Sequence, residues 1–279
     1  MKQLSLYLLG LLMIVSCGDK RHTSDSDEDE DEVELQFKQF AYTSPDSSMV
    51  VLKAEVPVNG GSPLADSIIH YLDETLAFGF AEFYEDNAKT ALQKAGEARL
   101  DSLQKEINET RAEFDTITEE MEWTFKWEDS KDISVIANTD RYITYVENGY
   151  DYRGGAHPYH WSYGTTFDKK TGQRIDASVL THTDTPSFKE MFHTSLGKYF
   201  EMQPGESLSD YLLIDIDDLK PSNVYFTEDK VIFQYQPYEI SYYAAGAPCA
   251  TFTFKEIKPY LTKKGLRLIE TEEEVDDED

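Results

Sequence analysis

The chain has 279 residues and a formal net charge of −28, with 54 acidic residues against 26 Lys and Arg. This acidity argues against nucleic acid as a partner, because binding to a phosphate backbone depends on Lys and Arg. With 40% apolar residues, 18 Tyr and 15 Phe, the composition predicts a folded, strand-rich body that is large enough for a proper core.

Residues 1–16 are typical of an export signal, because Lys2 precedes an apolar run from Leu4 to Val15 and small Ser16 follows. The run is too short to cross a bilayer as a helix, which needs ~20 apolar residues. Ile14 to Cys17 resembles the bacterial lipobox, in which the thiol takes a lipid and cleavage makes this Cys the new N-terminus. We therefore expect Cys17 to anchor the protein to the bacterial cell envelope, in the outer membrane, facing the periplasm or the exterior. The alternative is an ordinary signal peptide with an incidental Cys.

Two acidic segments flank the body. Residues 17–34 form a predicted linker with nine acidic residues from Asp19 to Glu34, and residues 267–279 form a predicted tail, with eight acids from Glu270 to Asp279. Neither can bury enough apolar surface to offset the entropy of ordering, so we expect both to be disordered. Once Asp19–Glu34 (−7), Glu270–Asp279 (−8) and Lys2 are set aside, the body keeps about −14. Such a surface attracts a basic protein or cationic ligand, or serves only solubility.

The first half of the body, residues 35–150, begins with two strand-like segments, Phe37–Tyr42 and Met49–Val58. Ser62-Pro63 predicts the start of a helix, with Ser as the N-cap and Pro in the first turn. Apolar residues then recur at spacing four: Leu64, Ile68, Leu72, Leu76 and Phe80.

A second helix is predicted over residues 87–120, packed on a sheet rather than in a coiled coil. Glu122–Glu128 alternates aromatic and polar residues and predicts a strand, and Ile133–Ala137 with Arg141–Val146 predicts a hairpin.

The second half, residues 151–266, contains a turn at residues 168–172 between the strand-like segments Thr165–Phe167 and Gln173–Ile175. Pro186–Met202 predicts an amphipathic helix, and Asn223–Tyr238 and Pro248–Ile257 predict strands. The pattern indicates an α+β fold, with antiparallel sheets packed against several amphipathic helices. We expect two related sub-domains, 35–150 and 151–266, that form one globular body.

Two segments of the second half stand out as candidate binding elements. In the first, Gly154–Pro158, paired glycines permit positive φ angles, and Pro158 holds His157 in an extended conformation. In the second, Tyr residues cluster before Gly246, where aromatic faces with polar tips suit carbohydrate or protein contact, although alternation along a strand places part of the cluster in the core. The predicted binding residues are Gly154, Gly155, His157, Pro158, His160, Tyr235, Tyr238 and Tyr243.

The Gly154–Pro158 turn, the Phe167–Gly172 loop and the Gln236–Gly246 segment together resemble a known family. It is the pair of extracytoplasmic domains of unknown function found in the lysozyme-sensing sigma-V anti-sigma factor and beside the catalytic domain of a peptidoglycan deacetylase. The resemblance is specific over Asp151–Leu266 and consistent in element order over Leu35–Val146. It implies an envelope-facing recognition domain. We expect neither a sigma-binding segment nor the deacetylase's catalytic domain in this chain.

The sequence lacks HExxH, paired CxxC and Gly-rich phosphate-binding patterns. A zinc site from His157, His160 and Asp151 is conceivable, but Pro158 excludes a shared helical face, and turn and surface roles for the two histidines are the simpler interpretation. Cys249 is expected to be a packed residue rather than a nucleophile. We therefore expect a non-catalytic module, with no cofactor and no metal, that binds a lysozyme-like basic protein or peptidoglycan. The alternative is an unrecognised hydrolase that acts on cell-wall glycan.

Overall fold

The computed structural model describes residues 35–45, 49–58, 61–77, 85–114, 116–122 and 125–270. The predictions for the signal, for Cys17, for the linker and for residues 271–279 lie outside these residues. The strands are β1 Phe37–Thr43, β2 Val50–Pro57, β3 Glu128–Asn138, β4 Tyr142–Tyr152, β5 Tyr159–Asp168, β6 Arg174–Ile175, β7 Val224–Phe226, β8 Lys230–Gln234 and β9 Cys249–Thr253. The α-helices are α1 Pro63–Leu72, α2 Glu85–Ala112, α3 Glu119–Glu122, α4 Pro186–Tyr199, α5 Phe254–Ile257 and α6 Lys263–Ile269, and a π-helical turn, η1 Asp73–Ala77, extends α1.

Six strands form the larger sheet in the order β1-β2-β3-β4-β5-β6, and β7-β8-β9 form a smaller one. All neighbouring strands are antiparallel except β2 and β3, which are parallel. This parallel pair follows from the connection between its strands, because the chain passes through α1 and α2 before it returns as β3. Sheets and amphipathic helices together confirm the predicted α+β fold.

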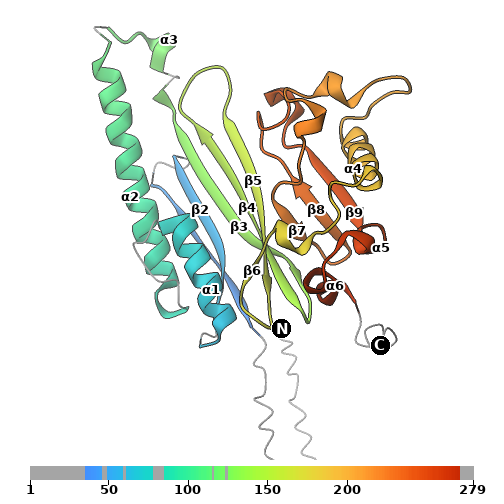
Figure 1. Cartoon of the computed structure of the whole chain (residues 1–279). Helices are drawn as coiled ribbons and strands as arrows, with labels where there is room; N and C mark the ends of the chain where they lie inside the picture. Colours follow the sequence, from blue (N-terminus) through green and yellow to red (C-terminus); the bar gives the residue numbers. More distant parts are fainter. Residues whose placement is uncertain are drawn as a thin grey trace, which may run out of the picture. The chain divides into compact units, whose positions relative to one another are not determined.

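Helices α1 and α2 cover one face of the larger sheet (Figure 1). The hydroxyl of Ser62 accepts a hydrogen bond from the N–H of Ala65, and Pro63 occupies the first turn, so α1 begins where the sequence predicts. Four members of the predicted stripe are buried against this face: Leu64, Ile68, Leu72 and Leu76. Burial of such aliphatic side chains contributes about 1.5–3 kcal/mol each.

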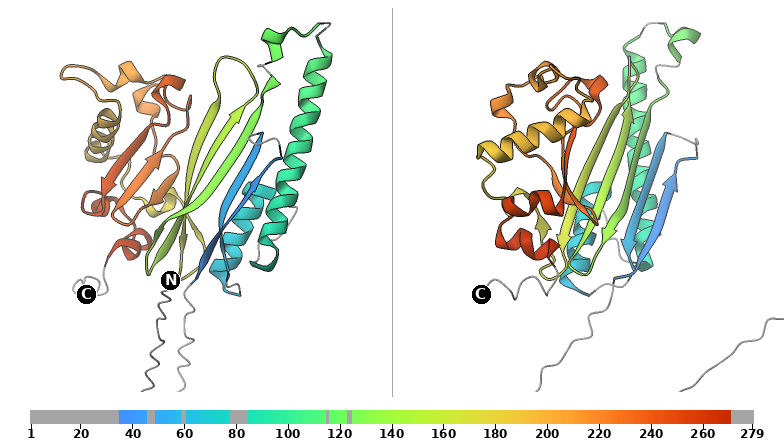
Figure 2. Two further views of the ribbon diagram at one scale, coloured as in Figure 1. Left: turned by 180° about the vertical axis from the view of Figure 1, so that it is seen from behind. Right: turned by 90° about the vertical axis from the view of Figure 1, so that its right-hand side faces the viewer.

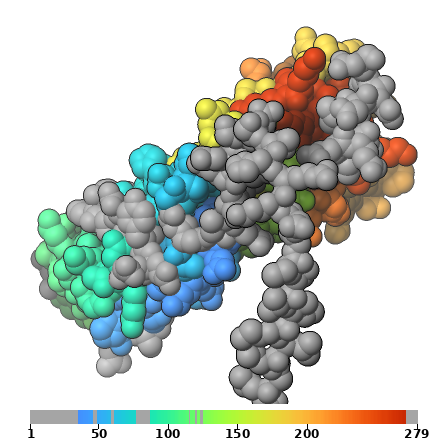
Figure 3. Space-filling view, turned by 90° about the horizontal axis from the view of Figure 1, so that it is seen from below, coloured from blue at the N-terminus to red at the C-terminus, as the bar shows by residue number. Residues whose placement is uncertain are grey.

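The opposite face carries the second layer, which contains the smaller sheet and α4 (Figures 1 and 2). Its core packs Phe188, Phe192 and Leu196 of α4 against Phe233 of β8 and Phe252 of β9. Strand β4 contributes to both cores, since Tyr142 belongs to the second layer's core and Ile143 to the helix-side core. In the view from below, the residues of the helix-covered side and those of the second layer occupy different ends of the surface (Figure 3).

Two side-chain amides join β5 to the second layer. Asn223 accepts a hydrogen bond from the N–H of Gly164 (2.9 Å) and donates one to its carbonyl (2.8 Å). Gln236 does the same at Ser162, with distances of 3.0 and 2.7 Å. Each amide therefore satisfies both backbone groups of one β5 residue, as a neighbouring strand would.

Several sequence predictions need correction. The second helix ends at Ala112 rather than at residue 120, and the described part of Glu122–Glu128 is not a strand until Glu128. Asn223–Tyr238 contains the hairpin of β7 and β8, and Pro248–Ile257 changes from β9 to α5 at Phe254, where Thr253 supplies the N-cap. The predicted border between residues 150 and 151 falls inside β4, so the larger sheet takes strands from both sides of it.

Within the described residues, no helix combines the length and the apolar character that crossing a membrane demands.

Candidate functional site

The Gly-Gly-Ala-His-Pro turn connects β4 to β5 and depends on backbone conformations that favour glycine. Gly154 has a φ of +78° and Gly155 a φ of +99°. A Cβ added to Gly155 would meet no atom within 4 Å, so the demand for glycine at this position comes from the backbone and not from crowding. The positive φ angles at both positions agree with the sequence prediction.

The turn presents His157 to two tyrosines of the second layer. The rings of His157 and Tyr243 stack with centroids 3.9 Å apart and an interplanar angle of 19°. The ring of Tyr238 lies 5.6 Å from that of Tyr243. The hydroxyl of Tyr243 donates a hydrogen bond to the carbonyl of Pro158, which ties the second layer to the turn. We call His157, Tyr238 and Tyr243 the aromatic patch.

Tyr238 is both exposed and strained. Its side chain keeps 54% of its surface open, and its φ is +69°. A bulky residue rarely adopts this left-handed conformation, which costs roughly 1–2 kcal/mol relative to the right-handed one. Glycine would avoid the cost, and the chain uses it at several other positive φ positions. Residues with strained backbone conformations cluster at functional sites, which makes this exposed tyrosine a candidate binding residue.

The remaining predicted binding residues lie elsewhere. Tyr235 is 2% exposed and donates a hydrogen bond to the carbonyl of Lys220, so it belongs to the core and not to a contact surface. Its place agrees with the expectation that strand alternation would bury part of the tyrosine cluster. His160 packs its ring edge to face with Tyr150, at 4.9 Å between centroids, on β5 rather than in the patch.

The structure does not bring the conceivable zinc ligands together. Asp151 pairs with Tyr159 across β4 and β5, and His160 pairs with Tyr150, so the side chains of Asp151 and His160 point to opposite faces of the sheet. Among the described residues, no group of three or more His, Cys, Asp or Glu side chains is arranged to hold a metal ion. At Cys249, burial raises the pKa of the thiol, which disfavours the thiolate that a nucleophile needs.

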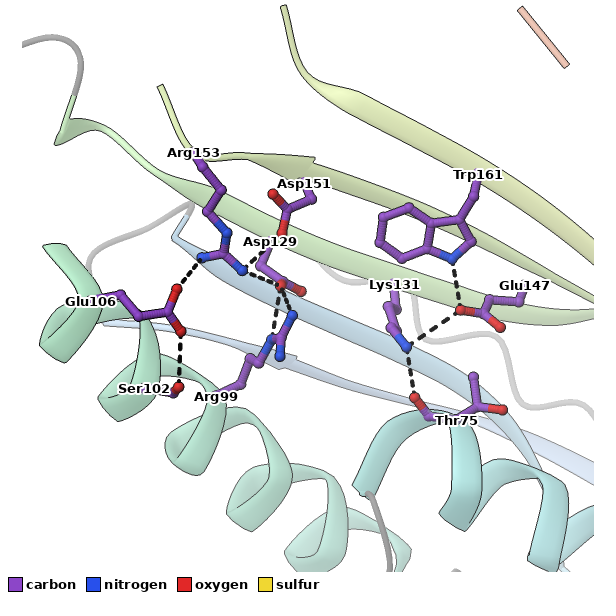
Figure 4. A network of polar contacts seen from close by, with 10 residues as sticks. All are labelled: Thr75, Arg99, Ser102, Glu106, Asp129, Lys131, Glu147, Asp151, Arg153 and Trp161. Carbon is purple, nitrogen blue, oxygen red and sulfur yellow. Dashed lines mark hydrogen bonds and ion pairs between the residues drawn. The ribbon is translucent and has the colours of Figure 1, made fainter. Parts of the chain in front are cut away.

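A second site, not identified from the sequence, lies between α2 and the larger sheet (Figure 4). Its centre is Asp129 of β3, whose side chain is only 1% exposed. Oδ2 accepts hydrogen bonds from Nε (2.8 Å) and Nη2 (2.5 Å) of Arg99 on α2, and from Nη2 of Arg153 (3.3 Å). Arg153 also pairs with Asp151 at 2.8 Å. Burial and the nearby Asp129 raise the pKa of Asp151, whereas Arg153 lowers it.

Beside this network lies a cavity of about 280 Å³, which we call the charged cavity. It is lined by Leu52, Leu76, Ala95, Ala98, Arg99, Ser102, Asp129 and Lys131. The Oδ1 atom of Asp129 is buried and has no hydrogen-bond partner among the described residues. A buried carboxylate oxygen without a partner is costly, so the site lacks one hydrogen-bond donor.

Three aromatic residues follow β5 at alternate positions on the same face of the sheet as the charged cavity. Tyr159 and Tyr163 are 41% and 42% exposed, and Trp161 between them stacks on Tyr159 at 5.9 Å. Trp161 lies across Gly149, where an added Cβ would come within 1.9 Å of the indole ring. We call these three residues the aromatic ledge.

Glu147 and Lys131 connect the ledge to the charged cavity. The indole N–H of Trp161 donates to Oε1 of Glu147 (2.8 Å), and Nζ of Lys131 lies 3.4 Å from the same oxygen. Lys131 also lines the charged cavity and donates to the carbonyl of Thr75 (2.8 Å). Lys131 and Glu147 thus link Trp161 of the ledge to the lining of the cavity (Figure 4).

Comparison with known protein families finds a match in each of two parts of the chain. Residues 78–160 match the family model described as "Deacetylase PdaC", and residues 184–255 match "Protein of unknown function (DUF3298)". The chain thus has a PdaC-like segment followed by a DUF3298-like segment. The aromatic patch joins both matches, because His157 lies in the PdaC match and both tyrosines lie in the DUF3298 match. The resemblance drawn from the sequence is confirmed, and the pairing indicates a cell-envelope-associated domain of unknown function.

A crystal structure of a DUF3298 family member from Bacteroides fragilis has the same fold. Its TM-score is 0.67 at 16% sequence identity, and the match covers 82% of this chain and 94% of that one. A DUF3298 protein from Pseudomonas aeruginosa matches over the same shares of the two chains, with a TM-score of 0.48 and 12% identity. No curated protein matches the sequence significantly.

Proposed function

We propose that this PdaC–DUF3298 pair is a non-catalytic recognition module of the cell envelope, whose aromatic patch binds a basic protein of the lysozyme type. The observation that supports the proposal most directly is the ring cluster of His157, Tyr243 and Tyr238, in which His157 and Tyr238 are exposed. Tyrosine rings combine apolar area with a polar tip and are enriched at protein interfaces. Peptidoglycan is the alternative ligand, since the same rings suit sugar faces.

The construction of the patch favours binding without rearrangement. The hydroxyl of Tyr243 is fixed on Pro158, and the turn beneath His157 is set by two glycines with positive φ. A preformed surface loses less conformational entropy when it binds, so more of the contact energy becomes affinity. The strained backbone of Tyr238 supports a functional role for its side chain, because selection for stability alone would favour glycine at this position.

The charge of the body favours a basic partner. The body keeps about −14 once the two acidic segments and Lys2 are set aside. Opposite net charges speed the encounter of two proteins, and salt slows it, because the Debye length falls from ~10 Å at 0.1 M to ~3 Å at 1 M. A shaped patch on an acidic body therefore combines fast encounter with specific contact.

The test is a calorimetric titration of the full chain carrying Cys17→Ser with lysozyme at low and moderate salt. We expect saturable one-to-one binding that weakens with Tyr238→Gly. Tyr242→Ala is the matched control, because Tyr242 is also exposed (46%) but lies outside the patch. Binding that disappears when residues 17–34 and 271–279 are removed would show a polyanion effect and contradict the proposal.

Two further outcomes separate the alternatives. Absence of lysozyme binding at low salt, together with binding to wall fragments that depends on Tyr238, would favour peptidoglycan as the ligand. Release of product from wall fragments, lost on replacement of His157, would favour the hydrolase alternative and contradict a non-catalytic module.

We also propose that Cys17 carries a lipid and anchors the module to the envelope, on the basis of the lipobox-like residues before it. Cys17→Ser should release the protein from membranes into the soluble fraction, as measured by fractionation and immunoblotting. Retention of the variant in membranes after normal signal removal would contradict a lipid anchor.

A further inference from the structure

The charged cavity and the aromatic ledge have the composition of a small-ligand site, and their charges exclude an ionic ligand. Arg99, Arg153 and Lys131 face Asp129, Asp151 and Glu147, and the half-exposed Glu106 also pairs with Arg153. Each charge of the site therefore already has an opposite partner, at distances of 2.5–4.0 Å. An added ion would meet a like charge in a partly buried setting, where repulsion is weakly screened. The fitting ligand is neutral.

The hydrogen-bonding state of Asp129 adds a second requirement. Its Oδ1 is buried and has no partner among the described residues, while Oδ2 already accepts from two guanidinium groups. A ligand with a neutral O–H or N–H group can donate to Oδ1 the hydrogen bond that this oxygen lacks. An ammonium donor does not fit, because Arg99 and Arg153 already surround the same group.

The aromatic ledge adds a third requirement. Tyr159, Trp161 and Tyr163 stand at alternate positions on β5, where the backbone repeat is ~6.8 Å, and the rings of Tyr159 and Trp161 lie 5.9 Å apart. The indole N–H of Trp161 is bound to Glu147, which holds the ring across Gly149. Such a row of rings, with the middle one held in place, suits an extended ligand with repeated flat, weakly polar faces and hydroxyl edges.

We infer that this surface is a binding site for a neutral, extended oligosaccharide, with sugar rings on the ledge and a hydroxyl or amide donor on Oδ1 of Asp129. Lys131 places the two parts within reach of one ligand, because it lines the cavity and its Nζ lies 5.8 Å from the centre of the Trp161 ring. The site goes beyond the proposed function, since it lies on the helix-covered face of the larger sheet and shares no residue with the aromatic patch.

The test is isothermal titration calorimetry of the full chain carrying Cys17→Ser with two neutral trimers, cellotriose and triacetylchitotriose, and with the cationic glucosamine trimer at pH 6. We expect saturable binding of at least one neutral trimer and binding of the cationic trimer that is about tenfold weaker or more. Trp161→Ala should weaken binding of the neutral trimer by about tenfold or more, as loss of a stacking ring does.

A second variant keeps the inference testable if Trp161→Ala unfolds. Ala98 lines the cavity from the exposed surface of α2, so Ala98→Trp should block the cavity and reduce binding while leaving the Asp129 network in place. Gln104→Trp is the matched control, because Gln104 is exposed on the same helix and does not line the cavity. Circular dichroism verifies the fold of each variant.

Three outcomes would overturn the inference. The first is that neither neutral trimer binds saturably at millimolar concentration. The second is that Ala98→Trp leaves binding unchanged. The third is that Tyr238→Gly abolishes binding while Trp161→Ala does not. The last result would assign the saccharide to the aromatic patch, so failure of this site and failure of the proposed function can be told apart.

Discussion

The aromatic patch and the charged cavity lie on different faces of the larger sheet and are held together by different forces. The patch consists of two exposed rings and the half-buried ring of Tyr243, whose positions depend on a turn with two positive φ angles and on one hydrogen bond from Tyr243. The cavity depends on buried ion pairs around Asp129, drawn from α2, β3 and the end of β4. The patch should therefore tolerate loss of its side chains, whereas the cavity should not.

The largest effect is expected from Asp129→Ala. The substitution leaves Arg99 and Arg153 without the carboxylate that they share at a site of 1% exposure, which should lower the free energy of unfolding by about 3–5 kcal/mol. Urea denaturation followed by circular dichroism measures the change. Asp132→Ala is the control, because Asp132 forms an exposed pair with Lys53 at 3.6 Å and should cost less than about 1 kcal/mol. Equal losses for the two variants would contradict the buried role of Asp129.

The next effect is expected at the turn. Gly155→Val should destabilise the fold by about 1–3 kcal/mol, because valine rarely adopts a φ of +99°. Ala156→Val is the matched control, since Ala156 is the exposed neighbour without a positive φ. Thermal unfolding of both variants checks the prediction, and identical melting temperatures would show that the turn places no constraint on the fold.

A smaller effect of opposite sign is expected at Tyr238. Tyr238→Gly should leave the free energy of unfolding unchanged or raise it by up to about 1 kcal/mol, because relief of the left-handed strain offsets the greater entropy of glycine. Glu201→Gly should behave in the same way, since Glu201 is exposed at a φ of +54° away from the patch. Only Tyr238→Gly should also weaken ligand binding. A clear loss of stability in Tyr238→Gly alone would show that its ring serves packing.

The smallest effect on stability is expected from His157→Ala. His157 is exposed, and its ring contacts Tyr243, the carbonyl of Pro158 and, at 3.5 Å, the hydroxyl of Tyr238, so the free energy of unfolding should change by less than about 0.5 kcal/mol. Calorimetric titration with the ligand should show the change instead. A loss of stability as large as that of Gly155→Val would mean that His157 holds the turn.

Sequence patterns predicted secondary structure well where a few neighbouring residues determine it. Ser62 and Pro63 start α1, the β3–β4 hairpin forms where it is predicted, and the glycine pair adopts positive φ. The alternation of Trp123, Phe125 and Trp127 predicted a strand, but β3 begins only at Glu128. Phe125 and Trp127 are buried, but they pack as an irregular segment under Arg111 and Arg153 before β3 begins.

Contacts between distant segments could not be predicted from the sequence. The stack of His157 on Tyr243 joins residues 86 positions apart, although both residues belong to segments that the sequence singled out. Nothing in the sequence distinguishes Asp129 among 54 acidic residues, because its burial depends on where α2 places Arg99. The parallel pairing of β2 with β3 brings these elements together, and strand patterns do not specify it.

The amides of Asn223 and Gln236 have a consequence for association between molecules. Beyond its short pairing with β6, β5 is an outer strand, and the free N–H and C=O groups of such a strand can recruit a strand from a second molecule. Asn223 and Gln236 occupy these groups at Gly164 and Ser162, so the protein protects the strand that carries the aromatic ledge. A protein with exposed tyrosines on an outer strand can thereby remain free of edge-to-edge aggregation at high local concentration.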